Sequence, residues 1–341
     1  MRILLLRTSA LGDVVQALPV LGALRRHLPD ARIAWVVEEW IAPLLAGHPD
    51  LDEIIPVRLR SWRKRPFERA TRRELGESLR AIARFSPEVA LDLMGNHKAG
   101  VLAALSFAER RLGFAREDRR EPSSAAWINE AVRPRGTHAV DRMLSLLDGL
   151  GLPAEPADFQ PGKIRPGEIP EAERAGAPGS EPFALVHPGA GWGNKRYPAA
   201  RWGAVARELR QRLGLETRIA ADPGDRTLAR EVVEASEGAA TVQEADIPEF
   251  VALARRAAIV LGGDSGPTHL AHALGRPVLM LMGPTDPAAH GPYAAPDSAL
   301  SKRLPCSYCH RRFDETKVCL LEITPGEVAE RAAGILRSFG F

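Results

Sequence analysis

The stretch "ILLLRTSALGDVVQALPVLGAL", residues 3–24, decides the fold class of this chain of 341 residues. Its first four residues are apolar and predict a buried strand, the polar residues from Thr8 to Asp13 predict a loop, and the periodic apolar residues that follow predict a helix. This order opens an α/β unit, whose ligands bind in the loops after the strands. The loop has neither a dinucleotide-binding glycine pattern nor a P-loop. It offers the carboxylate of Asp13 instead.

The same alternation of strand and helix signals continues along the chain and predicts parallel sheets covered by helices on both faces. Residues 151–182 interrupt it with seven Pro and five Gly in 32 positions. Such a segment cannot propagate a helix or a strand ladder, so we interpret it as an interdomain connection. The rhythm then restarts at 183–187. We therefore expect an α/β protein with two Rossmann-like, doubly wound parallel-sheet domains that face each other across a cleft.

Composition places few limits on the function. The chain is 45% hydrophobic and 26% charged, and its formal net charge is +3. Residues 57–73 nevertheless hold eight Arg or Lys against a single acid, Glu68. Three cysteines near the end do not make a disulfide framework, which favours a reducing, cytoplasmic setting. We find no signal peptide and no apolar run of about 20 residues, so we expect a soluble protein or one on a membrane surface.

The strongest local motif is "LGGDSGPTHLAHALG", residues 261–275. Its glycines allow a tight turn after a strand, and Asp264, Ser265 and Thr268 place oxygens where a helix begins. The N–H groups and positive potential of a helix N-terminus suit a phosphate. The alternative is a plain capped helix with Asp264 as its cap. Three glycines around a carboxylate, with His269 one turn later, exceed what capping requires.

A second glycine-rich loop, "HPGAGWGNKRYP" at 187–198, also follows a strand and contains Lys195. Backbone donors and a lysine can hold a diphosphate, although a solvated surface loop is the alternative. Two such loops in one half favour a nucleotide-diphosphate ligand. After the next strand, either Asp222 or Asp225 could accept ribose hydroxyls, unless "DPGD" is an ordinary turn.

The first half has no such loops. Its Asp13, beside a basic surface, suggests a general base that acts on an anionic acceptor; the alternative is a helix cap. Lys98 follows another predicted strand. The basic run at 57–73 is either a solvated charged face or, given Trp62 and Phe67 within it, an interfacial segment.

The cysteines stand as "CSYCHRRFDETKVC" and raise the question of zinc. Cys306 and Cys309 form a C-x-x-C pair, and Cys319 and His310 complete the group. His310 directly follows Cys309, which strains tetrahedral geometry, and three thiolates fall short of the common closed set. We expect structural thiols and no metal.

Together these motifs resemble glycosyltransferase family 9, the bacterial lipopolysaccharide heptosyltransferases. The resemblance covers nearly the whole chain and is carried by "TSALGDVVQALP" (8–19), by "HPGAGWGNKRYP", by "GGDSGPTHLAHALGRPVLMLMGPTDP" (262–287) and by the late cysteine cluster that ends in "ITPGEV". Within the family, residues 35–64 look most like the members that move L-glycero-D-manno-heptose from ADP-heptose to the Kdo of Kdo-lipid A.

The resemblance implies an inverting enzyme of GT-B fold with no cofactor and no catalytic metal. Asp13 is then the general base, and Lys195 stabilises the leaving diphosphate. The implied donor-binding residues are Ala190, Asp225, Asp264, Ser265, Gly266 and His269, and the implied acceptor-binding residues are Arg60, Arg63, Lys64 and Lys98.

The implied domains are an acceptor-binding domain at 1–165, a linker at 166–182 and a nucleotide-sugar-binding domain at 183–325. A terminal helix, 326–341, returns to the N-terminal domain. We expect a monomer without a nucleic-acid partner, on the cytoplasmic face of the inner membrane.

This chain departs from the family pattern in two places. It lacks a further Cys-Pro within the late cluster, which weakens any metal interpretation. It also has "GNHKAG" (95–100) where a Gln-Gly version is more usual. Three alternatives stay open: heptosyltransferase II or another family 9 transferase, a GT-B nucleotide-sugar epimerase or hydrolase, and a non-enzymatic anion-binding protein.

Overall fold

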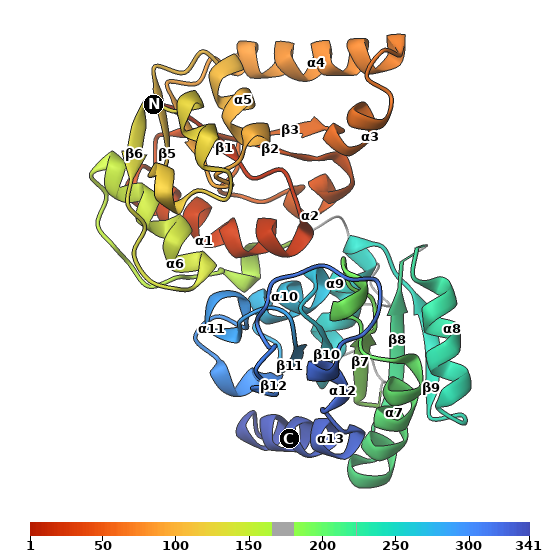
Figure 1. The fold of residues 1–341 in the computed structure, drawn as a ribbon. Helices are drawn as coiled ribbons and strands as arrows, with labels where there is room; N and C mark the ends of the chain where they lie inside the picture. Colours follow the sequence, from red (N-terminus) through yellow and green to blue (C-terminus); the bar gives the residue numbers. More distant parts are fainter. Residues whose placement is uncertain (166–180, 223) are drawn as a thin grey trace. The chain divides into compact units, whose positions relative to one another are not determined.

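The computed structural model describes residues 1–165, 181–222 and 224–341. The chain divides into two compact units, Met1–Gly167 and Glu168–Phe341. Each unit is built on its own six-stranded parallel sheet (Figure 1). Of the linker expected at 166–182, residues 166–180 lie outside the described residues. Within the described part of the chain, no helix combines the length and the apolar character needed to cross a bilayer.

In the first unit the strand order is β3-β2-β1-β4-β5-β6. The strands are β1 (Arg2–Leu6), β2 (Arg32–Glu38), β3 (Glu53–Val57), β4 (Val89–Asp92), β5 (Arg110–Phe114) and β6 (Glu130–Val132), and the helices are α1 (Leu11–His27), α2 (Ala42–Leu45), α3 (Leu59–Lys64), α4 (Arg69–Phe85), α5 (His97–Leu105) and α6 (Ala139–Leu144). The opening stretch therefore forms β1, a loop and α1, as its pattern predicts. Central β1 is buried from Ile3 to Leu6 because helices cover both of its faces.

In the second unit the order is β12-β11-β10-β7-β8-β9. The strands are β7 (Phe183–His187), β8 (Glu216–Ala221), β9 (Ala240–Glu244), β10 (Ile259–Gly263), β11 (Val278–Met282) and β12 (Ala299–Ser301), and the helices are α7 (Ala199–Leu213), α8 (Arg226–Ala235), α9 (Ile247–Arg256), α10 (Gly266–Ala273), α11 (Pro287–His290), α12 (Val318–Leu321) and α13 (Pro325–Ser338). Central β7, β10 and β11 are fully buried apolar strands.

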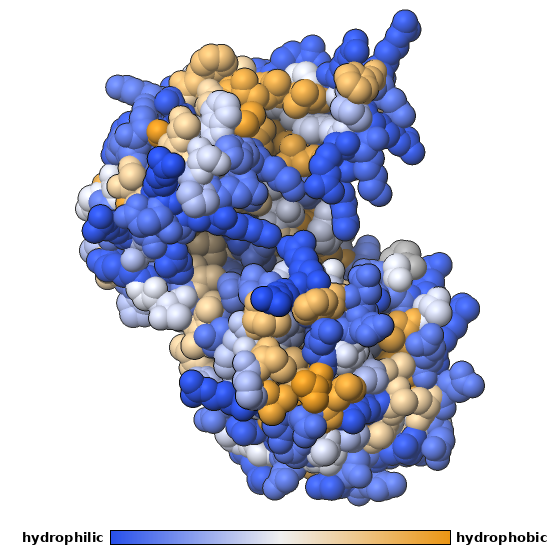
Figure 2. All heavy atoms as spheres, viewed as in Figure 1, coloured by the Kyte–Doolittle hydropathy of each residue, from blue (hydrophilic) through white to orange (hydrophobic). Residues whose placement is uncertain are grey.

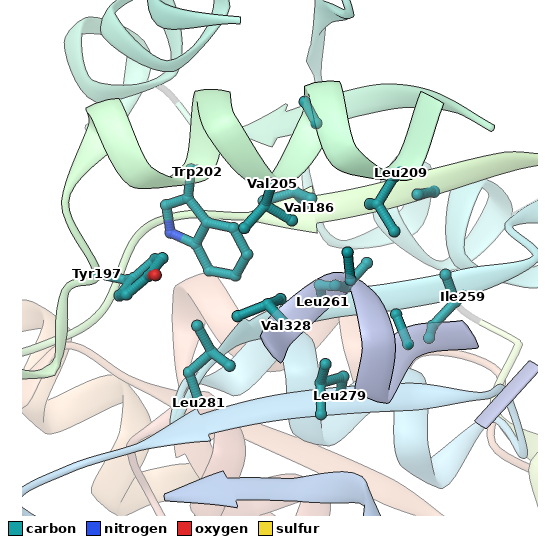
Figure 3. Packing of buried hydrophobic residues seen from close by; sticks show 14 of the residues in the cluster. Val186, Tyr197, Trp202, Val205, Leu209, Ile259, Leu261, Leu279, Leu281 and Val328 are labelled. Atoms are coloured by element: carbon teal, nitrogen blue, oxygen red, sulfur yellow. The ribbon is translucent and has the colours of Figure 1, made fainter. Parts of the chain in front are cut away.

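The terminal helix α13 completes the core of the second unit. Val328 and Leu336 on α13 belong to the same buried cluster as Trp202 and Leu209 on α7 and Leu261 on β10 (Figure 3). The apolar residues of α13 recur at helical spacing on one face, so the helix has a single apolar stripe. That stripe packs against the core of the second unit. Helix α13 is thus part of the core of the second unit.

Candidate functional site

Three loops of the second unit meet at one edge of its sheet. Strand β10 pairs with β7 on one side and with β11 on the other, all in parallel. Their carboxyl ends therefore lie at the same edge, where open α/β sheets bind ligands. The loops that follow are 188–198 after β7, 264–265 after β10 and 283–286 after β11. Each contributes a side chain to one polar cluster.

Asp264 is the centre of that cluster. Its Oδ2 atom lies 2.5 Å from Nζ of Lys195 and accepts a hydrogen bond of 2.7 Å from Oγ1 of Thr285. Its Oδ1 atom lies 3.1 Å from Nε2 of His269. The two predicted donor-site residues Lys195 and His269 are thus brought together with Asp264, and Thr285 joins them from the "GPTDP" motif.

The carboxyl group of Asp264 is held in its ionised form. Burial by itself raises the pKa of this side chain, which is only 10% exposed. The hydrogen bond from His269 and the positive charge of Lys195 outweigh burial and hold the pKa well below its ordinary value. Lys195 and Asp264 therefore form a nearly buried ion pair at the carboxyl ends of β7 and β10.

The helix that follows begins without a side-chain cap. Ser265 occupies the N-cap position of α10, but its side chain makes no capping hydrogen bond. Its hydroxyl lies instead 3.1 Å from Oγ1 of Thr268 and 3.4 Å from Nδ1 of His187. Asp264 is not the cap either, so the capping alternative for this carboxylate is wrong. The start of α10, beginning with Gly266, offers unpaired backbone N–H groups of the kind that favour an anion.

Asp225 lies against the glycine-rich loop. A Cβ atom on Gly189 would overlap the Asp225 carboxylate, so glycine is required there for the two segments to approach. Arg196 Nη2 lies 3.7 Å and His187 Nε2 4.0 Å from this carboxylate. Burial lowers the pKa of His187 even though Asp225 opposes that shift. Ala190, another predicted donor-site residue, accepts a hydrogen bond from Arg196 through its carbonyl oxygen.

The late cysteine segment packs on the same glycine-rich loop. Buried Asn194 donates from its backbone to Phe313 O at 2.9 Å and from Nδ2 to Arg311 O at 2.7 Å. Thr316 donates from Oγ1 to Arg196 O at 2.9 Å. The segment therefore holds the loop that carries Lys195.

The three cysteines of that segment are free thiols. Cys306 and Cys309 are exposed and Cys319 is buried. Burial raises the pKa of the Cys319 thiol, and nearby Cys306 adds to the shift. Among residues 1–165, 181–222 and 224–341, no three His, Cys, Asp or Glu side chains group as metal ligands would.

Asp13, in the first unit, sits in the first turn of α1. Its Oδ2 accepts a hydrogen bond of 3.0 Å from the backbone N–H of Ala10, and its Oδ1 lies 2.8 Å from Nη2 of Arg7. Arg7 also donates to Leu93 O at 2.7 Å. Asp13 thus takes part in capping the helix, as the alternative interpretation has it, yet its side chain stays 39% exposed. Arg7 and Ala10 fix the orientation of this carboxylate at the carboxyl end of β1.

Two of the predicted acceptor-site residues lie around a buried glutamate. Glu38, at the end of β2, is 6% exposed, and its Oε1 accepts a hydrogen bond of 3.2 Å from Arg60 N. Burial raises the pKa of Glu38, while the backbone N–H of Arg60 and the charges of Lys98 and Arg60 oppose the shift. Its own N–H donates to Thr8 O at 2.9 Å, in the loop of Asp13. Glu38 thus links Arg60 and Lys98, which are far apart in the sequence, to that loop.

The other two predicted acceptor-site residues, Arg63 and Lys64, form the last turn of α3. Both are exposed. Within the described residues, neither side chain forms a hydrogen bond or ion pair with Glu38, Arg60 or Lys98.

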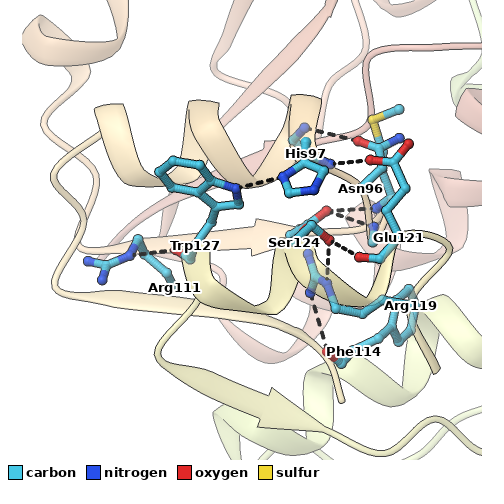
Figure 4. Close-up of polar contacts among 12 residues, drawn as sticks. Asn96, His97, Arg111, Phe114, Arg119, Glu121, Ser124 and Trp127 are labelled. Atoms are coloured by element: carbon cyan, nitrogen blue, oxygen red, sulfur yellow. Dashed lines mark hydrogen bonds and ion pairs between the residues drawn. The ribbon is translucent and has the colours of Figure 1, made fainter. Parts of the chain in front are cut away.

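Lys98 is positioned by a polar network at the start of α5 (Figure 4). Asn96 caps the helix by accepting from Ala99 N at 3.1 Å. His97 accepts at Nδ1 from Trp127 Nε1 at 2.9 Å, and its backbone N–H donates to Glu121 at 2.8 Å. The unusual "GNHKAG" segment therefore ties α5 to residues 121–127.

A buried ion pair lies beneath this network. Arg119 and Asp92 form it, and both side chains are fully buried. Arg119 also donates to Ser124 Oγ at 2.8 Å and to Phe114 O at 3.2 Å. Asp92 accepts from the N–H groups of Met94 and Gly95 at 3.0 Å each. The pair thus orders the chain between β4 and α5.

The model of glycosyltransferase family 9 (heptosyltransferase) matches residues 72–319. The chain belongs to this family. It is a glycosyltransferase, and its two parallel-sheet units are those of the GT-B fold. Family membership excludes a purely anion-binding protein and favours transfer over the epimerase and hydrolase alternatives.

Curated relatives of this family 9 enzyme cover its whole length. It is 28% identical to lipopolysaccharide heptosyltransferase 1 of Pseudomonas aeruginosa over 355 positions, which cover 98% of each chain. It is 26% identical to lipopolysaccharide heptosyltransferase 2 of Salmonella typhimurium over 358 positions, which cover 100% of each. The structure of Escherichia coli heptosyltransferase WaaC with ADP matches it with a TM-score of 0.81 and 24% identity, over 98% of this chain and 100% of the other.

Sequence reasoning missed several residues of the two clusters. Thr285 lies in a motif that was recognised, but nothing local marks its hydroxyl as a partner of Asp264. His187 ends a strand and could have been found from that position. Arg7 and Glu38 also end or follow strands, where side chains point toward ligand loops. Their positions at strand ends are visible in the sequence, but their contacts with one another depend on the order of the strands in the sheet.

Proposed function

We propose that the protein transfers L-glycero-D-manno-heptose from ADP-heptose to the Kdo of Kdo-lipid A with inversion at the anomeric carbon. The observation that carries this proposal is the Lys195–Asp264 pair at the uncapped start of α10, with Thr285 and His269 beside it. Similarity over full length to heptosyltransferase 1 supports the choice of substrates. WaaC structures with ADP and with ADP-2-deoxy-2-fluoro heptose share this fold and support a nucleotide-heptose donor.

In this proposal the second unit binds the donor. The N–H groups at Gly266 and around Ala190 hold the diphosphate, and Asp225 accepts ribose hydroxyls. Ser265 and His269 line the diphosphate and the sugar. Both oxygens of Asp264 already accept protein hydrogen bonds, but a carboxylate has about four acceptor positions, so one remains for a heptose hydroxyl. Asp264 also holds Lys195 in place.

The first unit supplies the base and binds the acceptor. The Kdo hydroxyl gives its proton to Asp13 as its oxygen attacks the anomeric carbon from the side opposite to ADP. The bond between that carbon and the diphosphate oxygen breaks, and ADP leaves with the electron pair. Lys195 neutralises the charge that develops on the leaving diphosphate. The carboxylate of Asp13 is 39% exposed, which leaves it accessible to an acceptor hydroxyl.

The acceptor is anionic, which fits the cations of the first unit. Arg60 and Lys98, linked through Glu38, face the carboxylates and phosphates of Kdo-lipid A, and Arg63 and Lys64 extend this basic surface. The enzyme then works as a monomer on the cytoplasmic face of the inner membrane, where its lipid acceptor lies.

The decisive experiment incubates the enzyme with ADP-heptose and either Kdo-lipid A or the same acceptor that already carries one heptose. We expect product only from Kdo-lipid A, and no release of free heptose when the acceptor is omitted. Turnover of the heptosylated acceptor alone would assign the second transfer, for which the similarity to heptosyltransferase 2 is the supporting observation. Other nucleotide sugars tested against Kdo-lipid A check the donor.

A further inference from the structure

An exposed phenylalanine marks the corner between α3 and α4. Phe67 is 83% exposed, and every residue from Arg63 to Ala70 is exposed. Exposure of a single phenylalanine is not unusual, and what distinguishes Phe67 is that it lies within the basic segment 63–73. We propose that this corner, residues 63–73, docks on an anionic lipid bilayer and inserts Phe67 at the boundary between headgroups and acyl chains.

The charges around Phe67 complement such a surface. Residues 63–73 contain six basic residues against Glu68 alone. Arg65 lies 3.8 Å from the carboxylate of Glu68, and Arg73 lies 3.8 Å from that of Glu77, so both ion pairs are long. No ion pair is recorded within the described chain for Arg69 or Arg72. In Figure 2 hydrophilic side chains cover the end of α4 that adjoins α3. Basic residues near an anionic membrane attract it, and the attraction is screened by salt.

Hydrogen bonds and ion pairs fix the conformation of the corner. Trp62 is 7% exposed, and its Nε1 donates to Glu74 at 3.0 Å, so this aromatic residue packs inside the unit, and of the two aromatic residues in the basic run only Phe67 is open to solvent. Arg58 pairs with Glu39 at 2.6 Å and with Glu74 at 2.7 Å. Thr71 Oγ1 donates to Arg65 O at 2.8 Å and closes the turn. These contacts fix α3 and the turn that follows it. Phe67 lies on that turn with its side chain exposed to solvent.

Lipid fits this corner better than nucleic acid does. Bases stack on an aromatic ring, but an aliphatic side chain gives them no stacking partner. The large exposed apolar side chains are Phe67 in the corner and, two residues beyond it on α4, Leu75, which is 37% exposed. Phenylalanine and leucine with surrounding arginine are typical of a segment that lies in the membrane interface. The inference rests on the proposed function only in that a lipid-linked acceptor lies in such a membrane.

The first experiment measures flotation of the full-length protein with vesicles of phosphatidylglycerol and phosphatidylethanolamine, and with phosphatidylcholine vesicles. We expect binding to the anionic vesicles alone, decreasing with added salt. Phe67→Ser should weaken it about tenfold. The matched control is Phe107→Ser, because Phe107 is 84% exposed in the same unit but lies outside the basic segment. Equal losses in both variants, or none in Phe67→Ser, would overturn the proposal.

The second experiment tests the charges. Arg69→Gln with Arg72→Gln should weaken binding roughly 20-fold, since each basic residue contributes about fivefold. The control is Arg80→Gln with Arg84→Gln, which removes the same charge from exposed positions of the same helix, about 16 Å along its axis. If the control pair loses as much, the attraction is diffuse and the corner is not a docking site. Binding of a nucleic-acid oligomer in preference to vesicles would also overturn the inference.

Activity separates this inference from the proposed function. Phe67→Ser should lower transfer to Kdo-lipid A in vesicles and leave transfer to a deacylated, water-soluble acceptor unchanged. Equal activity of variant and wild type on both acceptors would overturn the docking inference and leave the transferase proposal intact. No transfer to either acceptor by the wild type would instead overturn the proposed function, while flotation still tests the corner.

Discussion

Nζ of Lys195 lies 2.5 Å from Oδ2 of Asp264, although 69 positions separate the two residues in the chain. Both side chains are nearly buried, at 13% and 10% exposure. Removing one partner of such an ion pair destabilises the fold, because the remaining charge stays buried without its partner. The pair couples the glycine-rich loop after β7 to the start of α10, so these two segments are held together by a charge contact.

Lys195→Ala should weaken ADP binding and turnover together. A charge-assisted hydrogen bond to a diphosphate contributes about 1.5–3 kcal/mol, so the dissociation constant for ADP should rise roughly 10- to 100-fold. Titration calorimetry with ADP measures the affinity. Lys302→Ala is the matched control, since Lys302 pairs with Glu327 and not with Asp264. An unchanged ADP affinity in Lys195→Ala would remove this lysine from the donor site.

Asp13→Asn should abolish transfer and spare donor binding. Asparagine keeps the acceptor oxygen for Ala10 N–H, so the start of α1 stays capped, but the amide cannot take the proton of an acceptor hydroxyl. General-base catalysis contributes about 10²- to 10⁴-fold, and the turnover number should fall by that factor. ADP affinity, measured in the same preparation, should match the wild type. Turnover within threefold of wild type would show that Asp13 is only a helix cap.

Glu38→Gln should make the protein more stable at neutral pH and not in acid. Burial raises the pKa of Glu38 above its ordinary value of 4.5, so the folded protein takes up this proton at a higher pH than the unfolded chain does. The ionised carboxylate therefore lowers stability above the raised pKa, and this cost is absent below pH 4.5. Thermal unfolding from pH 4 to 8 measures the difference.

In that titration the two melting temperatures should converge as the pH falls. A variant less stable than wild type at pH 7 would mean that the charges of Arg60 and Lys98 outweigh burial. The Michaelis constant for the acceptor gives a second readout, because glutamine can accept from Arg60 N but carries no charge for Lys98. We expect it to rise while the Michaelis constant for ADP-heptose stays the same.

Arg119→Met should destabilise the first unit by about 3–5 kcal/mol, because it leaves Asp92 buried without its partner. Denaturant unfolding measures this. The control is Arg133→Met, which breaks an exposed pair with Glu117 and should cost less than about 1 kcal/mol. If both substitutions cost the same, the buried pair does not order the chain between β4 and α5.

The sequence predicts the central strands well because they are short, apolar and bounded by loops. The strands expected at 3–6 and 183–187 agree with β1 and β7 to within a residue at each end. Two edge strands of the second unit carry little of this signal: β9 is mostly exposed and β12 has three residues. Pattern analysis missed both, since a half-exposed strand alternates weakly and a short one hardly at all.

The site divides in a similar way. Lys195 and Asp264 lie in glycine-containing loops after strands, and His269 lies in the helix that follows the second loop, so local pattern was sufficient to select them as candidates. Their mutual contacts were not predictable, because these depend on β7 and β10 being neighbours in the sheet while lying far apart in the sequence. The terminal helix shows the same limit. Its apolar stripe indicates that it packs against something, and nothing in the stripe identifies α7.

The position of α13 has a consequence for how the protein is made. Residues 1–167 contain a whole sheet with its own helices, so this unit can fold while the rest of the chain is still being synthesised. The second unit lacks part of its core until Val328, Ile335 and Leu336 have been added. The second unit can therefore acquire its final packing only after α13 itself has been synthesised.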